Sequence, residues 1–343
     1  MLKAFQEIYP DAPIFVLFYD KNKMGHLFSE EKVRTSFIQD LPYALEKYQW
    51  YLPLMPYATE RHNLMDYDVV LSSTSAFAKG IITHHNSTHV CYCHTPTRYL
   101  WTDTHSYVEN LNYNWLIKKL ILLYLNRLRT WDRISADRVD KFIANSNAVR
   151  HRINKFYRRE SDVIYPPVET GKFSISPTVG NYYLAGGRLV AYKRFDMLVN
   201  AFNRLNIPLK IFGEGPELEK LQNMAKPNVE FVGKITDEDK AKLYSQCIAY
   251  INPQEEDFGI TVVEAMASGR PVIAYKKGGA LETVVDGQTG VFFDEPDWET
   301  MADAILRFQP EKFYPQKIRE HALKFDKEEF KNKIKAYIDN LAN

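Results

Sequence analysis

Two apolar patterns alternate along the second half of the chain. Short apolar runs of four or five residues are separated by longer segments whose apolar residues recur every three or four positions. The short runs are typical of strands and the longer segments of helices. The predicted strands are residues 182–185, 209–212, 229–232, 249–252 and 271–275, and the predicted helices are residues 195–205, 216–225, 237–245 and 261–267. This alternation predicts βαβ units around a parallel sheet.

The first half follows the same pattern less clearly, with predicted strands at residues 14–18, 69–72, 89–93 and 142–144. The chain has 343 residues, which favours two domains over one core. Tyr165-Pro166-Pro167 can continue neither a helix nor a central strand, so it marks a linker. We therefore expect two α/β domains and a C-terminal helix that packs back on the first domain. The expected bounds are 1–167, 168–323 and 324–343.

Composition narrows the range of partners. A net charge of +1 gives no sign of nucleic-acid binding, and three cysteines are too few for a disulfide framework. No stretch approaches the roughly 20 apolar residues of a membrane span, and no signal peptide is visible. These features predict a cytoplasmic protein that is soluble or peripheral to the inner face of the membrane.

One long amphipathic segment, residues 115–133, combines a broad apolar stripe with flanking lysines and arginines. A core helix with a solvated basic edge explains this pattern. Peripheral docking on an anionic membrane explains it equally well. The sequence leaves both interpretations open.

The segment from Gln254 to Glu264 holds the clearest chemistry. A strand ends near Asn252, and a helix begins near Thr261, so the amides of Gly259 and Ile260 face outward at a helix N-terminus. Such a terminus binds anions, and a glycine lets a phosphate approach closely. Glu256 precedes the helix and Glu264 lies about one turn inside it. Two unrelated surface carboxylates would be the simpler interpretation if this segment stood alone.

A second charged segment follows the first strand of this half. Gly186-Gly187 make a turn that is followed by Arg188 and Lys193. Arginine offers a planar fork to two phosphate oxygens and lysine a mobile charge. Open α/β sheets bind ligands at the carboxyl ends of their strands. These two cations are therefore candidates for stabilising negative charge on a departing diphosphate.

Other motifs give weaker signals. Gly213-Glu214-Gly215 lacks the third glycine of a dinucleotide fingerprint. Asp66 and Asp68 lead directly into a strand, and the Cys91-Tyr92-Cys93 spacing is not that of a zinc site. His94 ends a strand, where a structural and a functional role are equally compatible with the sequence.

With these residues in view, the chain resembles the retaining GT-B glycosyltransferases of family 4, in particular bacterial mannosyltransferases of O-antigen and surface-polysaccharide synthesis. The resemblance rests on GGRLVAYKRFDML, GEGPEL, FVGKITDED, PQEEDFGITVVEAMASGRPVIA and CYCHTPTRYLW. It implies two Rossmann-like domains whose parallel sheets face each other across a cleft. Compared with this family, the first strand and its glycine loop are missing before Met1.

The resemblance also implies roles for single residues. Arg188 and Lys193 would bind the diphosphate, Glu256 the donor sugar and Glu264 the ribose. Asp237 would accept hydrogen bonds from guanine, which favours GDP over UDP. The remaining expected contacts are His94 against the donor sugar and Gly187, Phe258, Gly259 and Ile260 around the donor.

The resemblance therefore implies a mannosyltransferase that uses GDP-mannose without a metal ion or other cofactor. The acceptor would be a growing glycan, linked to a lipid. Three alternatives stay open: the same fold with a UDP-sugar donor, a nucleotide-sugar-binding protein without transferase activity, and a sugar-nucleotide epimerase.

Overall fold

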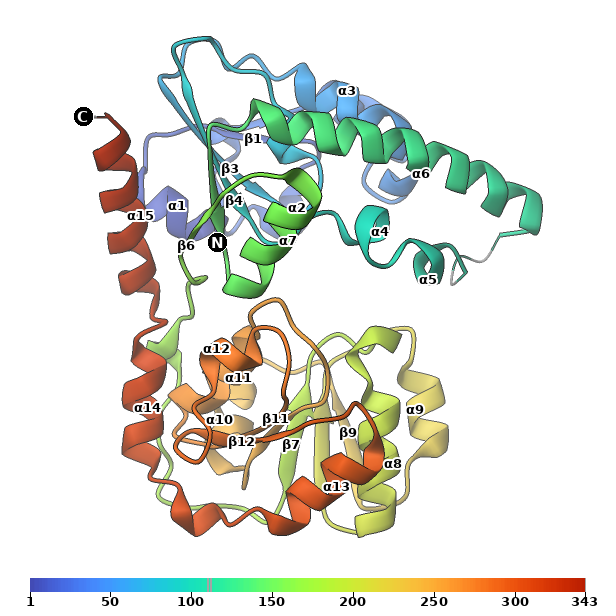
Figure 1. Cartoon of the computed structure of the whole chain (residues 1–343), viewed down its shortest axis with the longest axis vertical. Helices are drawn as coiled ribbons and strands as arrows, with labels where there is room; N and C mark the ends of the chain where they lie inside the picture. The colour runs from blue at the N-terminus through green and yellow to red at the C-terminus, as the bar shows by residue number, and fades with distance from the viewer. Residues whose placement is uncertain (110, 112, 343) are drawn as a thin grey trace. The chain divides into compact units, whose positions relative to one another are not determined.

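The computed structural model describes residues 1–109, 111 and 113–342. Its internal contacts divide the chain into two compact units, Met1–Ile164 (the first unit) and Tyr165–Asn343 (the second unit). Each unit contains a parallel sheet with helices packed around it (Figure 1). The predicted α/β class with two parallel-sheet domains is confirmed. The division at residues 167 and 323, and the packing of residues 324–343 on the first domain, stay predictions.

The second unit is built on a six-stranded parallel sheet. Its strand order is β12-β11-β10-β7-β8-β9. The strands are β7 (Tyr183–Gly186), β8 (Leu209–Phe212), β9 (Val229–Gly233), β10 (Tyr250–Asn252), β11 (Val272–Tyr275) and β12 (Gly290–Phe293). From β7 the chain adds strands on one side of the sheet, and from β10 it adds them on the other. The point between β7 and β10 is therefore a topological switch point, where open α/β sheets bind ligands.

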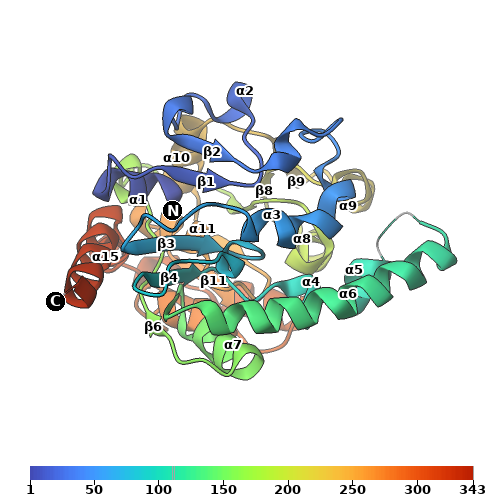
Figure 2. The same cartoon turned by 90° about the horizontal axis from the view of Figure 1, so that it is seen from above.

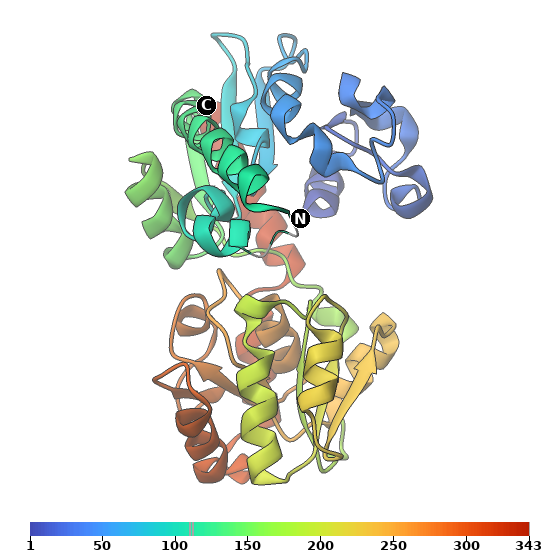
Figure 3. The same cartoon turned by 90° about the vertical axis from the view of Figure 1, so that its right-hand side faces the viewer.

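The helices of the second unit cover both faces of this sheet, as Figures 1 and 3 show. Helices α8 and α13 contact each other on one side, and α11 and α14 contact each other on the other. The helices are α8 (Phe195–Leu205), α9 (Leu218–Met224), α10 (Asp237–Gln246), α11 (Ile260–Ala267), α12 (Ala280–Thr283), α13 (Trp298–Arg307), α14 (Pro315–Leu323) and α15 (Lys327–Ala342).

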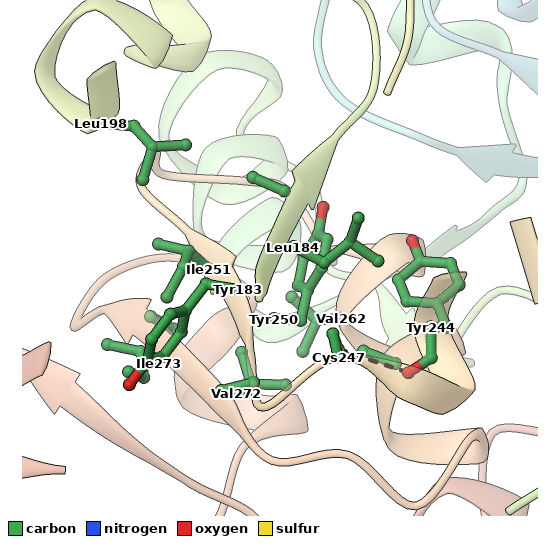
Figure 4. Packing of buried hydrophobic residues seen from close by; sticks show 14 of the residues in the cluster. Tyr183, Leu184, Leu198, Tyr244, Cys247, Tyr250, Ile251, Val262, Val272 and Ile273 are labelled. Atoms are coloured by element: carbon green, nitrogen blue, oxygen red, sulfur yellow. Dashed lines mark hydrogen bonds between the residues drawn. The ribbon is translucent and has the colours of Figure 1, made fainter. Parts of the chain in front are cut away.

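The central strands of this sheet are buried on both faces (Figure 4). Leu184, Ile251 and Ile273 are fully buried on three adjacent strands, and Val262 of α11 packs in the same core. Parallel strands covered on both sides are made of nearly continuous apolar residues. This explains why the sequence of the second half predicts its strands well.

The first unit has a smaller sheet of order β3-β4-β5-β6, and β1 and β2 form a separate parallel pair. Figure 2 shows these two groups of strands from above. The strands are β1 (Ile14–Val16), β2 (Val33–Thr35), β3 (Val69–Thr74), β4 (Thr88–Cys93), β5 (Lys141–Ala144) and β6 (Asp162–Val163). The helices are α1 (Leu2–Ile8), α2 (Lys21–Met24), α3 (Met55–Glu60), α4 (Arg98–Trp101), α5 (Thr104–Glu109), α6 (Trp115–Ser135) and α7 (Asn147–Tyr157).

The core of the first unit contains a buried ion pair. Asp132 of α6 is 1% exposed and accepts hydrogen bonds from Thr97 Oγ1 (2.8 Å), Trp101 Nε1 (2.8 Å) and Tyr157 OH (2.9 Å). Lys79 Nζ lies 2.5 Å from Asp132 Oδ1 and is equally buried. These contacts join α6, α7 and the loop that follows β4. We call these five residues the Asp132 cluster.

Cys91, Cys93 and Cys247 are buried, and none of them forms a disulfide. Among the described residues, no helix is both long and apolar enough to cross a membrane. The predicted helix at residues 115–133 is confirmed as α6, which begins after Asn114, whose side chain accepts a hydrogen bond from the Ile117 amide.

Candidate active site

Two loops meet at the switch point of the second unit, one after β7 and one after β10. Lys193 comes from the first loop and Glu256 from the second, and Lys193 Nζ lies 2.9 Å from Glu256 Oε1. Both side chains are mostly buried, with 13% and 17% of their surfaces exposed. The strand order therefore brings together a cation and a carboxylate that the sequence predicts for the same site.

The buried side-chain amide of Gln254 also holds the Glu256 carboxylate. Gln254 Nε2 donates a hydrogen bond of 2.8 Å to Glu256 Oε1. Gln254 is 2% exposed, so its position is fixed by packing. Its own Oε1 and the Oδ1 of Asn252 are buried without a hydrogen-bond partner among the described residues. Buried polar atoms without partners are rare and cost free energy.

The loop after β10 is fixed by close backbone approaches. The Gly279 amide donates to the Glu256 carbonyl at 2.8 Å. A Cβ at Gly278 would lie 2.4 Å from that carbonyl oxygen, and one at Gly279 would lie 2.3 Å from the Cα of Phe258. Side chains at either position would push the loop away. These glycines therefore hold Glu256 in place.

Helix α11 begins at the end of this loop. Gly259, its N-cap, has a φ of +91°, a conformation that glycine adopts without strain. The first amides of a helix have no partner within it, so those of Ile260 and Thr261 remain available for an anion. The Phe258 ring, in contrast, is buried against Tyr165 and Phe325. Its backbone is therefore the part of Phe258 that a donor can contact.

The loop after β7 supplies a second cation. Gly187 has a φ of +133°, and Lys193 Nζ would lie 3.1 Å from a Cβ placed there. Arg188 is exposed, and no ion pair or hydrogen bond holds its guanidinium among the described residues. A Cβ on Gly213 would lie 1.9 Å from the Gly187 carbonyl oxygen, so the loop after β8 packs directly on this one. Arg188 thus remains free to fold over a bound anion.

Glu264 lies on α11, and two side chains of helix α10 contact its carboxylate. Lys240 Nζ is 2.9 Å from Glu264 Oε1, and Tyr244 OH donates to Oε2 at 3.1 Å. Burial raises the pKa of Tyr244 well above its ordinary value, so this hydroxyl stays a donor. The carboxylate predicted to bind ribose is therefore oriented by two donors before any ligand arrives.

Asp237 opens helix α10, one turn before Lys240. Its Oδ2 lies 2.9 Å from Lys172 Nζ, which also lies 2.6 Å from Glu169 Oε2. The hydrogen bond from Lys172 lowers the pKa of Asp237, although 65% of this side chain is exposed. Asp237 is therefore an accessible, ionised carboxylate beside a lysine.

His94 belongs to the first unit, where it follows β4. Its Nε2 lies 2.9 Å from Ser73 Oγ, and its ring meets the Tyr92 ring edge-on at 5.4 Å. Three residues later the chain enters the Asp132 cluster at Thr97. The segment that carries His94 is thus fixed at both ends. The role implied for His94 stays a prediction.

The structure brings Lys193 and Glu256 into contact and connects Asp237 to Glu264 through Lys240. Sequence reasoning missed the residues that orient these carboxylates, namely Gln254, Lys172, Lys240 and Tyr244. Lys240 and Tyr244 were recognisable in principle, because they follow Asp237 at helical spacing. Lys172 gives no such signal. Among the described residues, no group of three or more His, Cys, Asp or Glu side chains is arranged to hold a metal ion.

The chain resembles known proteins over both halves. Residues 17–172 match the family described as Glycosyltransferase Family 4, and residues 170–325 match the one described as Glycosyl transferases group 1. Alpha-1,3/1,6-mannosyltransferase ALG2 of Dictyostelium discoideum is 28% identical over 291 residues, which cover 70% of this chain and 66% of that protein. A GDP-mannose-dependent alpha-mannosyltransferase of Corynebacterium glutamicum is 34% identical over 123 residues, which cover 36% of this chain and 30% of that protein. The chain thus spans less than two thirds of the length of either relative.

A solved structure shows the same fold. HepE of Anabaena in complex with UDP superposes with a TM-score of 0.73 at 18% identity, covering 99% of this chain and 95% of HepE. At this identity the likeness concerns the fold alone. Because the two family matches together run from residue 17 to residue 325, the chain belongs to glycosyltransferase family 4, the glycosyl transferases group 1, and has the GT-B fold.

Proposed function

We propose that this protein is a retaining glycosyltransferase that moves mannose from GDP-mannose to a hydroxyl of a growing, lipid-linked glycan in surface-polysaccharide synthesis. The observation that supports this most directly is the Lys193–Glu256 pair beside the N-terminus of α11, at the switch point of the second sheet. A cation, a carboxylate and free helix amides then surround one small region. That combination suits a sugar joined to a diphosphate.

In the proposed reaction the bond between the sugar C1 and the distal phosphate oxygen breaks, and negative charge builds on that oxygen. Lys193, Arg188 and the first amides of α11 stabilise this charge more in the transition state than in the ground state. The acceptor oxygen forms its bond to C1 on the face that the phosphate leaves. The departing phosphate takes the acceptor proton.

Glu256 accepts hydrogen bonds from sugar hydroxyls in this proposal. Its Oε1 is held by Lys193 and Gln254, which leaves Oε2 for the donor. Holding one oxygen fixes where the other points, and such positioning reduces the entropy lost when the sugar is oriented. Glu256 therefore aligns the sugar while Lys193 and Arg188 receive the phosphate charge.

The choice of GDP-mannose rests on Asp237 and on the mannosyltransferases among the relatives. A UDP-sugar is the alternative donor, because uracil also has an N–H group that can donate a hydrogen bond to a carboxylate. Titration of the protein with GDP and with UDP, in the absence of divalent metal, distinguishes the two. Tighter binding of UDP would overturn the choice of GDP-mannose and leave the family unaffected.

Substitution of Glu256 tests the reaction. We expect Glu256→Ala to lower the release of GDP from GDP-mannose by a factor on the order of 10², measured with glycolipid extract from the source cells as acceptor. Glu255→Ala is the matched control, since it removes a neighbouring carboxylate, 37% exposed, that lies 3.8 Å from Lys277. Full activity in Glu256→Ala would rule out the proposed role of this site.

We also propose that helix α6 contacts an anionic membrane surface, where a lipid-linked acceptor is found. Trp115, Leu120 and Leu123 are 63%, 66% and 68% exposed, which is unusual for apolar side chains on one helix. Lys119, whose Nζ lies 4.7 Å from the Trp115 ring centre, and Arg127 place positive charge on the same helix. Apolar side chains with flanking cations are typical of helices that lie in a membrane interface.

Vesicle flotation tests this contact. We expect binding to vesicles that contain an anionic phospholipid and not to neutral vesicles. Leu120→Glu together with Leu123→Glu should abolish it, while Leu306→Glu, at an equally exposed leucine of α13, should not. Equal binding of the α6 double variant would show that this helix is not the contact.

A further inference from the structure

Residues 36–57 of the first unit carry an unusual number of aromatic side chains. Six of these 22 residues are Phe, Tyr or Trp, against 14% of the whole chain. Four of the six rings are strongly exposed, namely Tyr43 (65%), Tyr48 (49%), Trp50 (59%) and Tyr57 (52%). Exposed apolar side chains that gather in one region mark an interaction surface.

The segment that carries these rings is firmly packed. Ile38 and Met55 are buried in one apolar cluster, and the partly buried Leu52 packs against it. Tyr124 OH of α6 donates a hydrogen bond of 3.2 Å to the Leu52 carbonyl. The apolar residues between the aromatic rings thus anchor the segment, so the exposed rings belong to a fixed surface and not to a loose loop.

Two of the exposed rings lie beside one ammonium group. Lys47 Nζ lies 4.2 Å from the centre of the Trp50 ring and 5.4 Å from the centre of the Tyr43 ring. A cation at these distances is attracted to both rings and fixes them relative to each other. Backbone hydrogen bonds from Lys47 to the Tyr43 carbonyl (2.8 Å) and from Trp50 to the Lys47 carbonyl (2.9 Å) support the same spacing. We call Tyr43, Lys47 and Trp50 the aromatic platform.

The backbone of Tyr43 is strained. Its φ of +56° lies in the left-handed region, which a bulky side chain rarely adopts. Tyr51 OH donates to the carbonyl of Pro42, the residue before Tyr43, at 2.5 Å and so braces this turn. Glycine or asparagine would adopt the same backbone with less strain and without a ring. Strain that surrounding contacts maintain under an exposed side chain indicates that the side chain has a function.

Exposed Tyr and Trp side chains are typical both of membrane contacts and of sugar-binding sites, and the charges here favour a sugar. Residues 36–57 contain two carboxylates and one lysine, which gives a formal charge of −1. Helix α6, with five Lys or Arg and one Asp, has a formal charge of +4. An anionic membrane surface therefore attracts α6 and not the platform. A neutral sugar needs no net charge, because its C–H faces pack on aromatic rings, and Lys47, the Tyr43 hydroxyl and the Trp50 N–H are hydrogen-bonding groups for its hydroxyls.

We propose that the aromatic platform is a carbohydrate-binding site that holds sugar residues of the acceptor glycan other than the one that receives the transferred sugar. This inference rests on the proposed function, because it needs a glycan acceptor. Rings that are held in place before binding lose little conformational freedom when the ligand arrives, and this favours affinity. The platform therefore makes the affinity for the acceptor depend on the length of the glycan, while the donor and the transfer step stay unaffected.

Acceptors of two lengths test the platform. The probes are lipid-free glycans released from the glycolipid extract of the source cells and separated into a short and a long fraction. Tyr43→Asn removes one ring and retains a residue that tolerates the left-handed backbone, and Trp50→Ala removes the other ring. In both variants KM for the long fraction should rise about tenfold, while KM for the short fraction and kcat stay the same.

Tyr314→Asn is the matched control. Tyr314 of the second unit is 63% exposed and has its own lysine, Lys317, whose Nζ lies 5.2 Å from the ring centre. This variant should retain the KM of the unmodified protein for both fractions. An equal rise of KM for the short and the long fraction in Tyr43→Asn would overturn the inference, because a site for distant sugar residues does not affect a short acceptor.

Calorimetric titration with the long fraction, without any donor, keeps this test apart from that of the proposed function. The unmodified protein should bind the long fraction, and Tyr43→Asn should bind it about tenfold more weakly. No binding by the unmodified protein, or equal binding by the variant, would overturn the inference. Loss of binding to anionic vesicles in Trp50→Ala would overturn it as well, since the platform would then contact the membrane. If the unmodified protein binds the long fraction and transfers no sugar to it from GDP-mannose, the proposed function fails and the carbohydrate site remains.

Discussion

One ion pair of the first unit and two ion pairs of the second unit lie in opposite surroundings. In the first unit, Lys79 and Asp132 are at most 2% exposed, and the carboxylate is surrounded by protein donors. In the second unit, Lys193, Glu256 and Asp237 follow the carboxyl ends of strands, and the pairs Lys193–Glu256 and Lys172–Asp237 keep part of their surface in solvent. Of these three ion pairs, only the two of the second unit keep surface that a ligand can reach.

This difference in burial leads to different expectations for the three pairs. A buried pair has lost its hydration and depends on its partners, so removal of one partner is costly. An exposed pair such as Lys172–Asp237 loses little when it opens, and each member can turn to a ligand. We therefore expect substitutions in the Asp132 cluster to affect folding and those at the switch point to affect catalysis.

The largest expected effect is on the stability of the first unit. Asp132→Ala leaves Lys79 charged and buried, with three other donors unpaired, and should lower the free energy of unfolding by about 3–5 kcal/mol. Urea denaturation followed by tryptophan fluorescence measures this loss, since four of the five tryptophans lie before residue 165.

Asp237→Asn is the control for this experiment, because it breaks an exposed pair and should cost less than about 1 kcal/mol. Affinity for GDP should respond in the opposite way, falling in Asp237→Asn and staying the same in folded Asp132→Ala. If Asp132→Ala lowered the free energy of unfolding as little as Asp237→Asn, the buried pair would not be more important for stability than the exposed pair.

The next effect concerns turnover. Lys193→Ala removes one of the cations proposed to stabilise the departing phosphate and should lower the transfer rate by on the order of 10²–10³, with little change in unfolding. Initial rates at saturating GDP-mannose give the factor. Lys220→Ala, an exposed lysine of α9 paired with Glu217, should retain the full rate. Equal rates in the two variants would mean that Lys193 is not part of the reaction.

Acid should weaken the first unit through His89. Burial lowers the pKa of His89 to about 4, whereas an imidazole in an unfolded chain titrates near 6.5. Between these values the unfolded chain takes up a proton that the native protein does not, so stability falls as the pH drops through this window. The loss amounts to about 3 kcal/mol at pH 4.

Urea midpoints at several pH values measure this loss. His89→Gln retains a polar side chain next to Ser72, whose Oγ lies 2.8 Å from His89 Nε2. Its unfolding should depend less steeply on pH than that of the unmodified protein. Parallel pH profiles would show that other groups, and not His89, cause the acid sensitivity.

The smallest expected effect is that of Gln254. Gln254→Ala removes one of the two donors that hold Glu256 Oε1. We expect the transfer rate to fall about tenfold, with the GDP affinity unchanged, because the sugar and not the nucleotide loses its alignment. Gln222→Ala, at an exposed position of α9, serves as the control. A loss of GDP affinity equal to the loss of rate would assign Gln254 a general structural role.

The sequence predicts the second unit better than the first, and burial explains why. Strands β7, β8, β10 and β11 are mostly buried, so each is a recognisable apolar run. Strand β2 has no buried residue, and its Val-Arg-Thr sequence resembles a loop. Strand β6 has two residues, and β12 has four residues beside a turn. Neither is therefore recognisable as a strand in the sequence.

The candidate site was predictable only in part. The spacing of Glu256, Gly259 and Glu264 lies within one loop and helix, and local sequence is enough to suggest an anion site. The contact of Lys193 with Glu256 depends on β7 and β10 being neighbours, which the order of strands along the chain does not specify. The same holds for Lys172 and Asp237. Partners from distant segments become visible only when the sheet order is known.

The buried cysteines provide a probe that needs no substitution. Cys91 and Cys93 lie on β4 of the first unit, and Cys247 lies in the second. Burial raises the pKa of Cys91 and Cys247 to about 12, so almost no reactive thiolate exists in the native protein at neutral pH. A thiol reagent should therefore modify each unit only when that unit opens. Mass spectrometry of the labelled peptides would then time the opening of the two units separately in a single sample.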